Sequence, residues 1–400
     1  MGCARSIWNA KVEEERYYRT YARKYCTIGT YAPIDQTTSQ FKSKELSPWL
    51  SECPSQILRN SAVNWYQTYQ KFMSGKCGRP KRKPKTDKGS IYLTREVFRF
   101  DHCDDGNVRL FIGTKTNNIG YLSFKAHGKF EIPNSLYVRK ERGHYYVSFC
   151  YEQGQPDRKL STNEEHLAFL QGATREYLEE HTMGVDRGVA IPVCAGEQTY
   201  DFTHSQKKNM SKADRYIKRL QRKLARQQKG SNRRAKTKHR IAVHHAKKAN
   251  IRNDFAHKTS RLLVDSSAKI IVFEALRTAR MTRRPKAKQD EQGRFISNKA
   301  KQKAGLNKSI LNVGWHVIET YTYYKAYSSS KAVFKIPAPT TSQECAKCGH
   351  THPDNRKTQA LFVCGNCGNT DNADHNASLV IKKRAINLIL DTGTVLSGDG

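Results

Sequence analysis

The sequence CAKCGHTHPDNRKTQALFVCGNCGNTDNADHNAS, residues 345–378, contains two Cys-x2-Cys pairs and runs directly into Asp-His-Asn-Ala-Ser. The pairs are Cys345 with Cys348 and Cys364 with Cys367, a spacing that predicts a tetrahedral zinc site with four thiolate ligands. A glycine follows each pair and permits the tight turn that directs two sulfur atoms at one metal ion. Because the protein fills all four positions, we expect one structural zinc ion. A zinc ribbon whose last ligand is Cys367 would not need the Asp-His-Asn-Ala-Ser segment that follows it. This raises the question of what Asp374 does.

Asp374 is one of three acidic residues that the sequence places at predicted apolar elements. Asp186 interrupts the apolar stretch MGVDRGVAIPVC at 183–194, and Glu274 lies near the end of the predicted strand AKIIVFEAL at 268–276. Taken singly, each is typical of a structural residue, and Asp is also a common cap where a helix begins. Taken together, three acids on separate elements could hold two divalent ions about 3.5–4 Å apart, as two-metal nucleases do. The spacing alone leaves both interpretations open.

The whole chain of 400 residues is strongly basic, with 71 Lys and Arg against 36 Asp and Glu and a net charge of +35. This charge favours a polyanionic partner, above all nucleic acid, although a ribosome-like or merely soluble basic protein would also carry it. The sequence has no apolar run of about 18 residues, so no membrane span is predicted. The N-terminus lacks the basic and then apolar residues of a secretory signal. Eleven cysteines, of which four form the zinc motif, indicate a reducing cytosol rather than a disulfide framework.

The N-terminal part is predicted to be helical, and its clearest helix is PSQILRNSAVNWYQTYQKFMSG at 54–75. One apolar stripe at helical spacing comprises Leu58, Ala62, Trp65, Tyr69 and Phe72. The polar residues off this stripe form either a solvated face, which the periodicity favours, or a DNA contact, and they include Gln56, Arg59 and Asn60. The basic turn GRPKRKPK at 78–85, with Arg79, marks a boundary.

Short strands separated by turns are predicted between residues 90 and 151. They are IYLTREVFRF, NVRLFIG, IGYLSF, KFEIP and HYYVSFCYE, and together they indicate a small barrel-like β-domain. The acidic segment 161–181 that follows is predicted to be helical and to form a connection or an insertion.

The segment 205–252 carries 18 Lys or Arg and a single Asp. Ile217, Leu220 and Leu224 keep helical spacing, and Gly-Ser-Asn at 230–232 breaks the segment into a helical hairpin. Like charges at i,i+4 destabilise an isolated helix, whereas a phosphate backbone would offset their repulsion. We therefore expect nucleic-acid contact here, with the candidate residues Lys218, Arg219, Arg222, Lys223, Arg233 and Arg234.

Four stretches, in this order along the chain, resemble the TnpB family, the OrfB-type RNA-guided nucleases of insertion sequences that are related to compact type V CRISPR effectors. GVDRGV at 184–189 is similar to the family's first RuvC-like motif, and IIVFEAL at 270–276 to the second. TSQECAKCG to CGNCG at 341–368 resembles the family's zinc ribbon, and DHNAS at 374–378 the third motif. Each motif alone is weak, but the ordered set is highly specific. CARSIWNAKVEEER at 3–16 and the helix at 54–75 resemble the family's N-terminal half, so the resemblance covers nearly the whole chain.

The resemblance implies a multidomain α/β fold, in which an RNase H-like (RuvC) nuclease core carries the zinc ribbon as an insert. A helical recognition lobe and a wedge-type β-barrel complete it. The implied boundaries are 1–85 for the recognition lobe, 86–160 for the wedge barrel, 161–181 for a linker or insertion helix, 182–340 and 371–392 for the nuclease, 341–370 for the ribbon and 393–400 for a tail. The basic helical hairpin at 205–262 would line the guide–target channel.

The resemblance also implies a function, which is RNA-guided cutting of DNA beside a short flanking motif by two-metal phosphodiester hydrolysis. Asp186, Glu274 and Asp374 carry over as the catalytic acids that bind two Mg²⁺ ions, and Asn376 as a neighbour that supports the site. The implied partners are a guide RNA from the element's end and double-stranded target DNA, with one protein monomer on one RNA in the prokaryotic cytoplasm, near the nucleoid. The helix at 54–75 then becomes a candidate reader of the flanking motif.

Two departures from the family pattern matter. Family members usually begin with a further strand and half-helix before the segment that matches residues 2–5, so we expect a wedge barrel with one strand fewer. Arg187 replaces a commoner small or apolar residue, and Ser378 replaces the common Ala, without removing a metal ligand. Two alternatives therefore accompany the nuclease, an RNA-guided DNA-binding repressor that does not cut and a truncated inactive relative. The presence of all three acids favours the nuclease.

Overall fold

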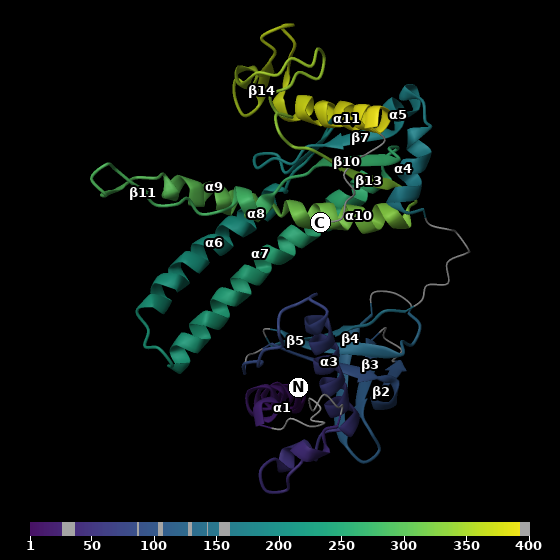
Figure 1. Cartoon of the computed structure of the whole chain (residues 1–400), viewed down its shortest axis with the longest axis vertical. Coiled ribbons are helices and arrows are strands. Elements are labelled where there is room, and N and C mark those ends of the chain that lie inside the picture. The colour runs from purple at the N-terminus through teal and green to yellow at the C-terminus, as the bar shows by residue number, and fades with distance from the viewer. Residues whose placement is uncertain are drawn as a thin grey trace. The chain divides into compact units, whose positions relative to one another are not determined.

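The computed structural model describes residues 1–25, 37–85, 88–102, 107–126, 130–141, 143–151 and 161–392. The chain divides into two units, Met1–Pro156 and Asp157–Gly400, and each unit combines helices and strands (Figure 1). The multidomain α/β class predicted from the sequence is therefore confirmed. The predicted tail at 393–400 lies outside the described residues. In the described part of the chain, no helix is both long enough and apolar enough to cross a lipid bilayer.

The first unit begins with helices. They are α1 Gly2–Tyr17, a π-helical turn Tyr18–Ala22, α2 Arg23–Tyr25, the 3-10 turns Ser39–Phe41 and Pro48–Leu50, and α3 Ser55–Met73. The predicted helix at 54–75 is α3, which follows Pro54 and ends before Gly75, whose φ of 74° is readily adopted only by glycine. Its predicted stripe packs against α1, and the buried members are Leu58, Ala62 and Trp65.

The strands of the first unit form two antiparallel sheets around one apolar core. They are β1 Gly89–Thr94, β2 Phe98–His102, β3 Asn107–Gly113, β4 Asn118–Lys125, β5 Ser135–Glu141 and β6 His144–Ser148. The sheet orders are β1-β5-β6 and β2-β3-β4, and inward-facing residues of both sheets share the core with Ala4 and Ile57.

One predicted strand in this region is wrong. The described residues of KFEIP, 130–133, lie outside any strand, and the strand instead begins at Ser135. Pro133 lacks the N–H that a ladder needs, whereas Leu136 and Val138 alternate inward in the manner of a half-buried strand. The predicted strand IYLTREVFRF is divided into β1 and β2 by a 3-10 turn, Arg95–Val97.

The second unit is built on a three-stranded parallel sheet in the order β13-β10-β7. Its strands are β7 Thr182–Val185, β10 Ile270–Glu274 and β13 Ala332–Ile336. Side chains alternate between the two faces, so Ile270 and Val272 pack with the C-terminal helix α11, Ala373–Thr392, while Ile271 and Phe273 pack on the opposite face. Figure 1 shows α11 on one side of the sheet and α10, Trp315–Ser328, on the other.

The predicted basic hairpin is present as two long helices, α6 His204–Ala225 and α7 Asn232–Asp265, which pack along each other. The segment at 161–181 forms two helices, α4 Asn163–Gln171 and α5 Arg175–His181. Leu170 and Leu178 from these helices are buried in the same core as α11, so the segment is part of the sheet's covering layer.

The smaller elements of the second unit complete the list. They are β8 Val193–Ala195, β9 Gln198–Tyr200, α8 Thr278–Met281, β11 Lys288–Gln289, β12 Phe295–Ile296, α9 Ala300–Val313, a 3-10 turn Pro353–Asn355, β14 Leu361–Val363 and β15 Thr370–Asn372. The hairpin of β14 and β15 carries the second cysteine pair in its turn and leads directly into α11.

Candidate functional site

Two of the three acids lie side by side at the carboxyl ends of neighbouring strands. The parallel register of β7 and β10 pairs Val185 with Phe273, so the next residues along each strand are Asp186 and Glu274. Neighbouring strands are about 4.8 Å apart, which brings the two backbones into adjacency. Asp186 is fixed further by two backbone hydrogen bonds with Cys194, at 2.8 and 2.9 Å. Only the pairing of distant segments creates this arrangement.

The third acid, Asp374, lies in the first turn of α11, and its side chain is buried. A close approach of α11 to β7 places it beside the strand ends. A Cβ atom at Gly184 would lie 2.1 Å from the carbonyl oxygen of Ser378, so the helix can pack here only because residue 184 has no side chain. A Cβ at Gly188 would lie 3.9 Å from Oδ2 of Asp374, which places the loop after Asp186 against the third acid.

Burial raises the pKa of all three carboxyls. The pKa of Asp186 rises to about 7, first because of burial and then because the carboxylates of Glu274 and Asp374 repel its negative charge. Burial also raises the pKa of Glu274, against the opposing effect of a hydrogen bond from the Thr341 hydroxyl to its Oε1. An acidic cluster of this kind is costly unless cations compensate it, and its oxygen donors suit a hard divalent ion such as Mg²⁺.

An arginine that the sequence analysis missed completes the acidic cluster. Nη2 of Arg356 lies 3.2 Å from Oδ1 of Asp374 and also donates to the carbonyl of Gln359 at 3.1 Å. Its positive charge lowers the pKa of Asp374, against the larger effect of burial, and acts in the same direction on Asp186 and Glu274. Arg356 lies between the two cysteine pairs and belongs to no motif with a defined spacing. The sequence offered only one hint of its role, which is a positive charge inside the predicted zinc ribbon.

Arg187, noted above as a departure from the family pattern, has a clear structural role. Its side chain is buried, pairs with Glu319 at 2.6 Å and donates through Nη2 to the backbone carbonyl of Glu274. Its guanidinium also lies over the ring of Phe273, 5.0 Å from the ring centre. Arg187 therefore joins the ends of β7 and β10 to helix α10, and Glu319 balances its charge.

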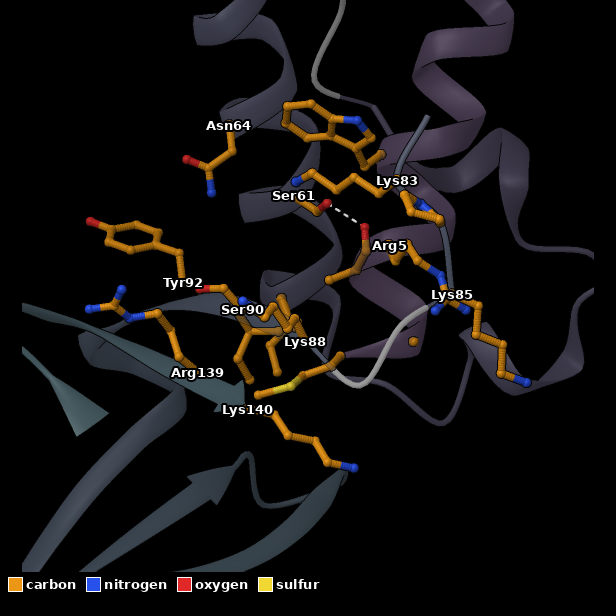
Figure 2. A pocket seen from close by; sticks show the side chains of 18 of the residues that line it. Arg5, Ser61, Asn64, Lys83, Lys85, Lys88, Ser90, Tyr92, Arg139 and Lys140 are labelled. Carbon is orange, nitrogen blue, oxygen red and sulfur yellow. Dashed lines mark hydrogen bonds between the residues drawn. The ribbon is translucent and has the colours of Figure 1, made fainter. Parts of the chain in front are cut away.

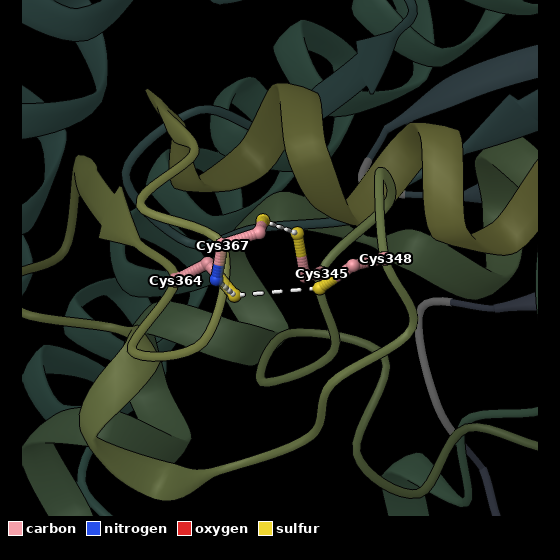
Figure 3. Close-up of side chains that lie close together, drawn as sticks. All are labelled: Cys345, Cys348, Cys364 and Cys367. Atoms are coloured by element: carbon pink, nitrogen blue, oxygen red, sulfur yellow. Dashed lines mark hydrogen bonds between the residues drawn. The ribbon is translucent and has the colours of Figure 1, made fainter.

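The four predicted zinc ligands come together in one cluster (Figure 3). Sγ of Cys345 lies 3.7 Å from that of Cys367, and Sγ of Cys348 lies 3.6 Å from that of Cys364. In the described part of the chain, this is the only group of three or more Cys, His, Asp or Glu whose potential ligand atoms all lie within 4.8 Å of one another. Four thiols so arranged fit a tetrahedral zinc ion. The three carboxylates form a wider cluster than the thiols do.

One asparagine ties the cysteine cluster to α11, and a second one joins the two cysteine turns. Asn376, predicted to support the acids, donates to the carbonyl of Glu344 at 2.7 Å and accepts from the N–H of Ala346 at 3.0 Å, so it binds the first cysteine turn to α11. Asn355, which the sequence analysis missed, donates to the carbonyls of Gln343 and His350 and accepts from the N–H of Gly365, bridging both cysteine turns. Because α11 also carries Asp374, the ribbon and the third acid are held by one set of contacts.

Most predicted nucleic-acid contacts on the basic hairpin are available to a ligand. The exposed residues are Lys218, Arg219, Arg222, Lys223 and Arg233. Arg234 differs, because its Nη1 donates to carbonyls at the end of α6, including that of Gln227 at 2.9 Å, and so helps to close the turn. The single acid of the tract, Asp214, binds Nζ of Lys248 at 2.6 Å and of Lys308 at 3.0 Å, which ties the hairpin to α9.

Of the predicted nucleic-acid contacts in the first unit, some are likewise exposed and others bind groups of the protein itself. Arg59 is exposed and Gln56 is half-buried on α3. Asn60 is buried, and its amide donates to the carbonyl of Tyr92 at 3.2 Å. The predicted contact of this side chain with nucleic acid is therefore wrong, because the side chain is not exposed to a ligand. Arg79 forms an ion pair with Glu15 and lies over the ring of Phe72, 4.7 Å from its centre.

A basic groove that the sequence analysis missed lies between α1, α3 and β1 (Figure 2). Its volume is about 760 Å³, and the cations that line it are Arg5, Lys83, Lys85, Lys88, Arg139 and Lys140. The segment with Lys83 is held in place by Asn9, which donates to its carbonyl at 3.1 Å and accepts its N–H at 2.7 Å. Nζ of Lys83 lies 3.4 Å from the ring centre of Trp8, and burial lowers its pKa. The groove thus combines six cations and one acid, Glu141, with the aromatic rings of Trp8 and Tyr92, a composition suited to nucleic acid.

Comparison with known proteins gives two family matches. Residues 148–284 match a family described as "Probable transposase" (OrfB_IS605), and residues 315–381 match the "Cas12f1-like, TNB domain". The first match contains Asp186 and Glu274, and the second contains the four cysteines and Asp374.

Two curated relatives and one solved structure are similar to the chain. "Putative RNA-guided DNA endonuclease InsQ" of Escherichia coli K12 is 28% identical over 379 residues, which cover 94% of this chain and 85% of the relative. "CRISPR-associated endodeoxyribonuclease Cas12f1" of Sulfoacidibacillus thermotolerans is 27% identical over 263 residues, which cover 63% of this chain and 53% of the relative. A Cas12f1 chain from a complex with sgRNA and target DNA shares the fold, with a TM-score of 0.52, 14% identity and coverage of 95% of this chain and 80% of that chain.

The two matched regions follow each other in the order expected from the sequence motifs, and the InsQ relative spans both of them. These similarities support the resemblance to the TnpB family that the sequence motifs indicate.

Proposed function

We propose that the protein is an RNA-guided DNA endonuclease of a transposable element, which cuts target DNA next to a short flanking motif. The observation that carries this proposal is the convergence of Asp186, Glu274 and Asp374 at one end of the parallel sheet, beside the cysteine cluster. The InsQ relative is named an RNA-guided DNA endonuclease, and the Cas12f1 relative an endodeoxyribonuclease. Both names support the same activity for this chain.

The three carboxylates would hold two Mg²⁺ ions. When bound, such ions supply the positive charge that activates a water molecule and stabilises the leaving oxygen in phosphodiester hydrolysis. The protein's own residues orient the ligands: the Thr341 hydroxyl holds Oε1 of Glu274, and the bridge with Cys194 fixes the backbone of Asp186. Arg356 would contribute a cation beside the reacting phosphate, because its guanidinium already lies against Asp374.

The zinc ion would act as a structural element. Its ligands Cys345 and Cys348 flank Ala346, whose N–H binds Asn376 on the helix that carries Asp374. Arg384 on the same helix reaches Glu344 at 2.8 Å. Asn376 is therefore proposed as a positioning residue that couples the zinc-bound turn to the third acid, rather than as a ligand of the magnesium ions.

Guide RNA and double-stranded target DNA are the proposed partners, with one monomer on one RNA in the prokaryotic cytoplasm. The proposed domains are those implied by the resemblance, with residues 182–340 and 371–392 as the RuvC-like nuclease and 86–160 as the wedge barrel. The exposed cations of α6 and α7 and the basic groove of the first unit are the proposed contacts to nucleic-acid phosphates. Gln56 and Arg59 remain candidates for reading the flanking motif.

The alternative function is an RNA-guided repressor that binds DNA without cutting it. Loss of any one acid from the cluster would favour the repressor, because the two-metal chemistry needs all of its ligands. All three acids are present, and burial together with mutual repulsion raises the pKa of Asp186, which is typical of a functional cluster rather than of surface residues. The arrangement favours the nuclease.

The test is cleavage of a plasmid library that carries a randomised sequence beside the target. The protein is co-expressed with RNA from its own locus, Mg²⁺ is supplied, and Asp186→Ala serves as the control. Cuts that depend on both the flanking sequence and Asp186 would establish the guided nuclease. Guide-dependent binding without any cut would support the repressor, and absence of both binding and cutting would identify an inactive relative.

A further inference from the structure

The hairpin of β11 and β12 has no role in the site described above. Lys288 pairs with Ile296 and Gln289 with Phe295, and the hairpin projects beyond α9, away from the parallel sheet (Figure 1). It follows Glu274 in the chain after residues 275–287, which include α8. The base of the hairpin is therefore joined through residues 275–287 to the strand end that carries one of the three acids.

The hairpin has a defined turn. Oδ1 of Asp290 accepts the backbone N–H of Gln292 at 3.0 Å and that of Arg294 at 2.8 Å, and Gly293 adopts a φ of 76°. At the base, the amide of Asn298 donates to the carbonyl of Lys286 at 2.8 Å. These bonds hold the two short strands in one register and fix which side chains the tip presents.

What the tip presents is an aromatic ring surrounded by cations. The side chain of Phe295 is 76% exposed and that of Ile296 49% exposed. Six cations lie between residues 283 and 299, against two acids, of which Asp290 is engaged in the turn. The exposed cations are Arg283, Arg284, Lys286, Lys288, Arg294 and Lys299. An apolar patch alone would suit many partners, but the charge selects a polyanion.

Single-stranded nucleic acid fits this combination better than a duplex does. Its unpaired bases offer faces that stack on an aromatic ring, while its phosphates bind the surrounding cations. In a duplex the bases are already stacked on one another, so the ring of Phe295 would gain nothing. We propose that the β11–β12 hairpin binds single-stranded DNA, with Phe295 stacked on an unpaired base and the neighbouring cations on the phosphates.

The choice of DNA rests on the proposed function, because the hairpin is covalently continuous with the strand that ends at Glu274, where that function places the DNA strand to be cut. Single-stranded RNA would offer the same stacking and charge, so the experiment includes it as a separate probe.

The test measures binding of fluorescein-labelled oligo(dT) to the full-length protein with its RNA, in buffer without added Mg²⁺ and at one fixed salt concentration. Phe295→Ala is expected to weaken binding about fivefold or more, the effect of losing one stacked base. Phe295→Trp should restore wild-type affinity. The matched control is Phe169→Ala on α4, whose ring is 62% exposed and lies outside the hairpin, and which should leave affinity unchanged. The same variants are measured with oligo(U) and with a blunt DNA duplex.

The proposal is overturned if Phe295→Ala binds oligo(dT) as tightly as the wild type, if the duplex loses affinity equally, or if only oligo(U) binding is weakened. Plasmid cleavage with Mg²⁺ is scored separately. A wild type that never cuts would refute the proposed nuclease, whereas selective loss of oligo(dT) binding in Phe295→Ala would still support the hairpin's role. If the wild type cuts and Phe295→Ala binds oligo(dT) as tightly as the wild type, only the proposed role of the hairpin is refuted.

Discussion

Replacement of Asp186 by asparagine should stabilise the metal-free protein while removing its cleavage. Burial and the neighbouring carboxylates raise the pKa of Asp186 from 3.8 to about 7. A rise of this size corresponds to about 4 kcal/mol of unfolding free energy lost when the carboxyl is ionised in the folded state. Because the side chain keeps some contact with solvent, we expect Asp186→Asn to recover about half of this, about 2 kcal/mol.

The pH dependence of this effect has a definite sign. The folded state holds the proton of Asp186 up to about pH 7, whereas the unfolded chain releases it near pH 3.8. The contribution of the carboxyl to stability is therefore fully present below the lower value and is lost as the pH rises through the upper one. The advantage of Asp186→Asn should be largest above about pH 7 and disappear near pH 4.

The assay is thermal unfolding without divalent cations at several pH values. A gain of about 2 kcal/mol corresponds to a rise in Tm of about 4–8 °C for a unit of this size. Asp354→Asn is the control, since its side chain is 81% exposed and the substitution should leave Tm unchanged. Added Mg²⁺ should stabilise the wild type more than the variant. The reasoning is refuted if the variant melts no higher than the wild type at alkaline pH, or if its advantage does not shrink as the pH falls.

Three further substitutions test the contacts around the acids. Arg356→Ala should slow single-turnover cleavage about 100-fold while RNA and target binding stay intact. The acid limb of the pH–rate profile should move to higher pH, because Arg356 lowers the pKa of Asp374. An unchanged profile would contradict this. Asn376→Ala leaves a partly buried N–H and a partly buried carbonyl without this partner, so chemical denaturation should show a loss of about 1 kcal/mol, and cleavage should fall as well. Gly184→Ala would place a Cβ 2.1 Å from a backbone oxygen of α11, and a decrease in Tm of several degrees is expected; an unchanged Tm would show that the helix can shift at no cost.

The motifs in the sequence predicted the local structure around the candidate site well, because such structure depends on neighbouring residues. Cysteine spacing with a following glycine favours a turn that brings two sulfurs together, and Figure 3 shows the four sulfurs in one cluster. The helix at 54–75 was likewise predicted from its local apolar periodicity, and the break at 230–232 from its turn residues. KFEIP failed as a strand because apolar content alone does not register the missing N–H of Pro133.

Predictions about which side chains are free to bind were less successful, because burial is set by packing between distant segments. Asn60 looked like a polar residue off the apolar stripe, yet β1 covers it and takes its amide hydrogen bond. Arg234 carried the same charge as its neighbours, but the end of α6 needs its guanidinium. Asn376 matched a motif position beside an acid, while its actual partners belong to the first cysteine turn.

The sequence by itself pointed to the family resemblance, the four candidate zinc ligands, the three candidate acids and the basic hairpin, since each depends on residue type and spacing. Only the tertiary structure decided how the acids meet, through the register of β7 with β10 and the close packing of α11 on Gly184. It also revealed Arg356, which reaches Asp374 from between the cysteine pairs. The physical reason is that a site built from separate strands, a helix and a cysteine-rich insert exists only after long-range packing has offset the entropy lost in bringing those segments together.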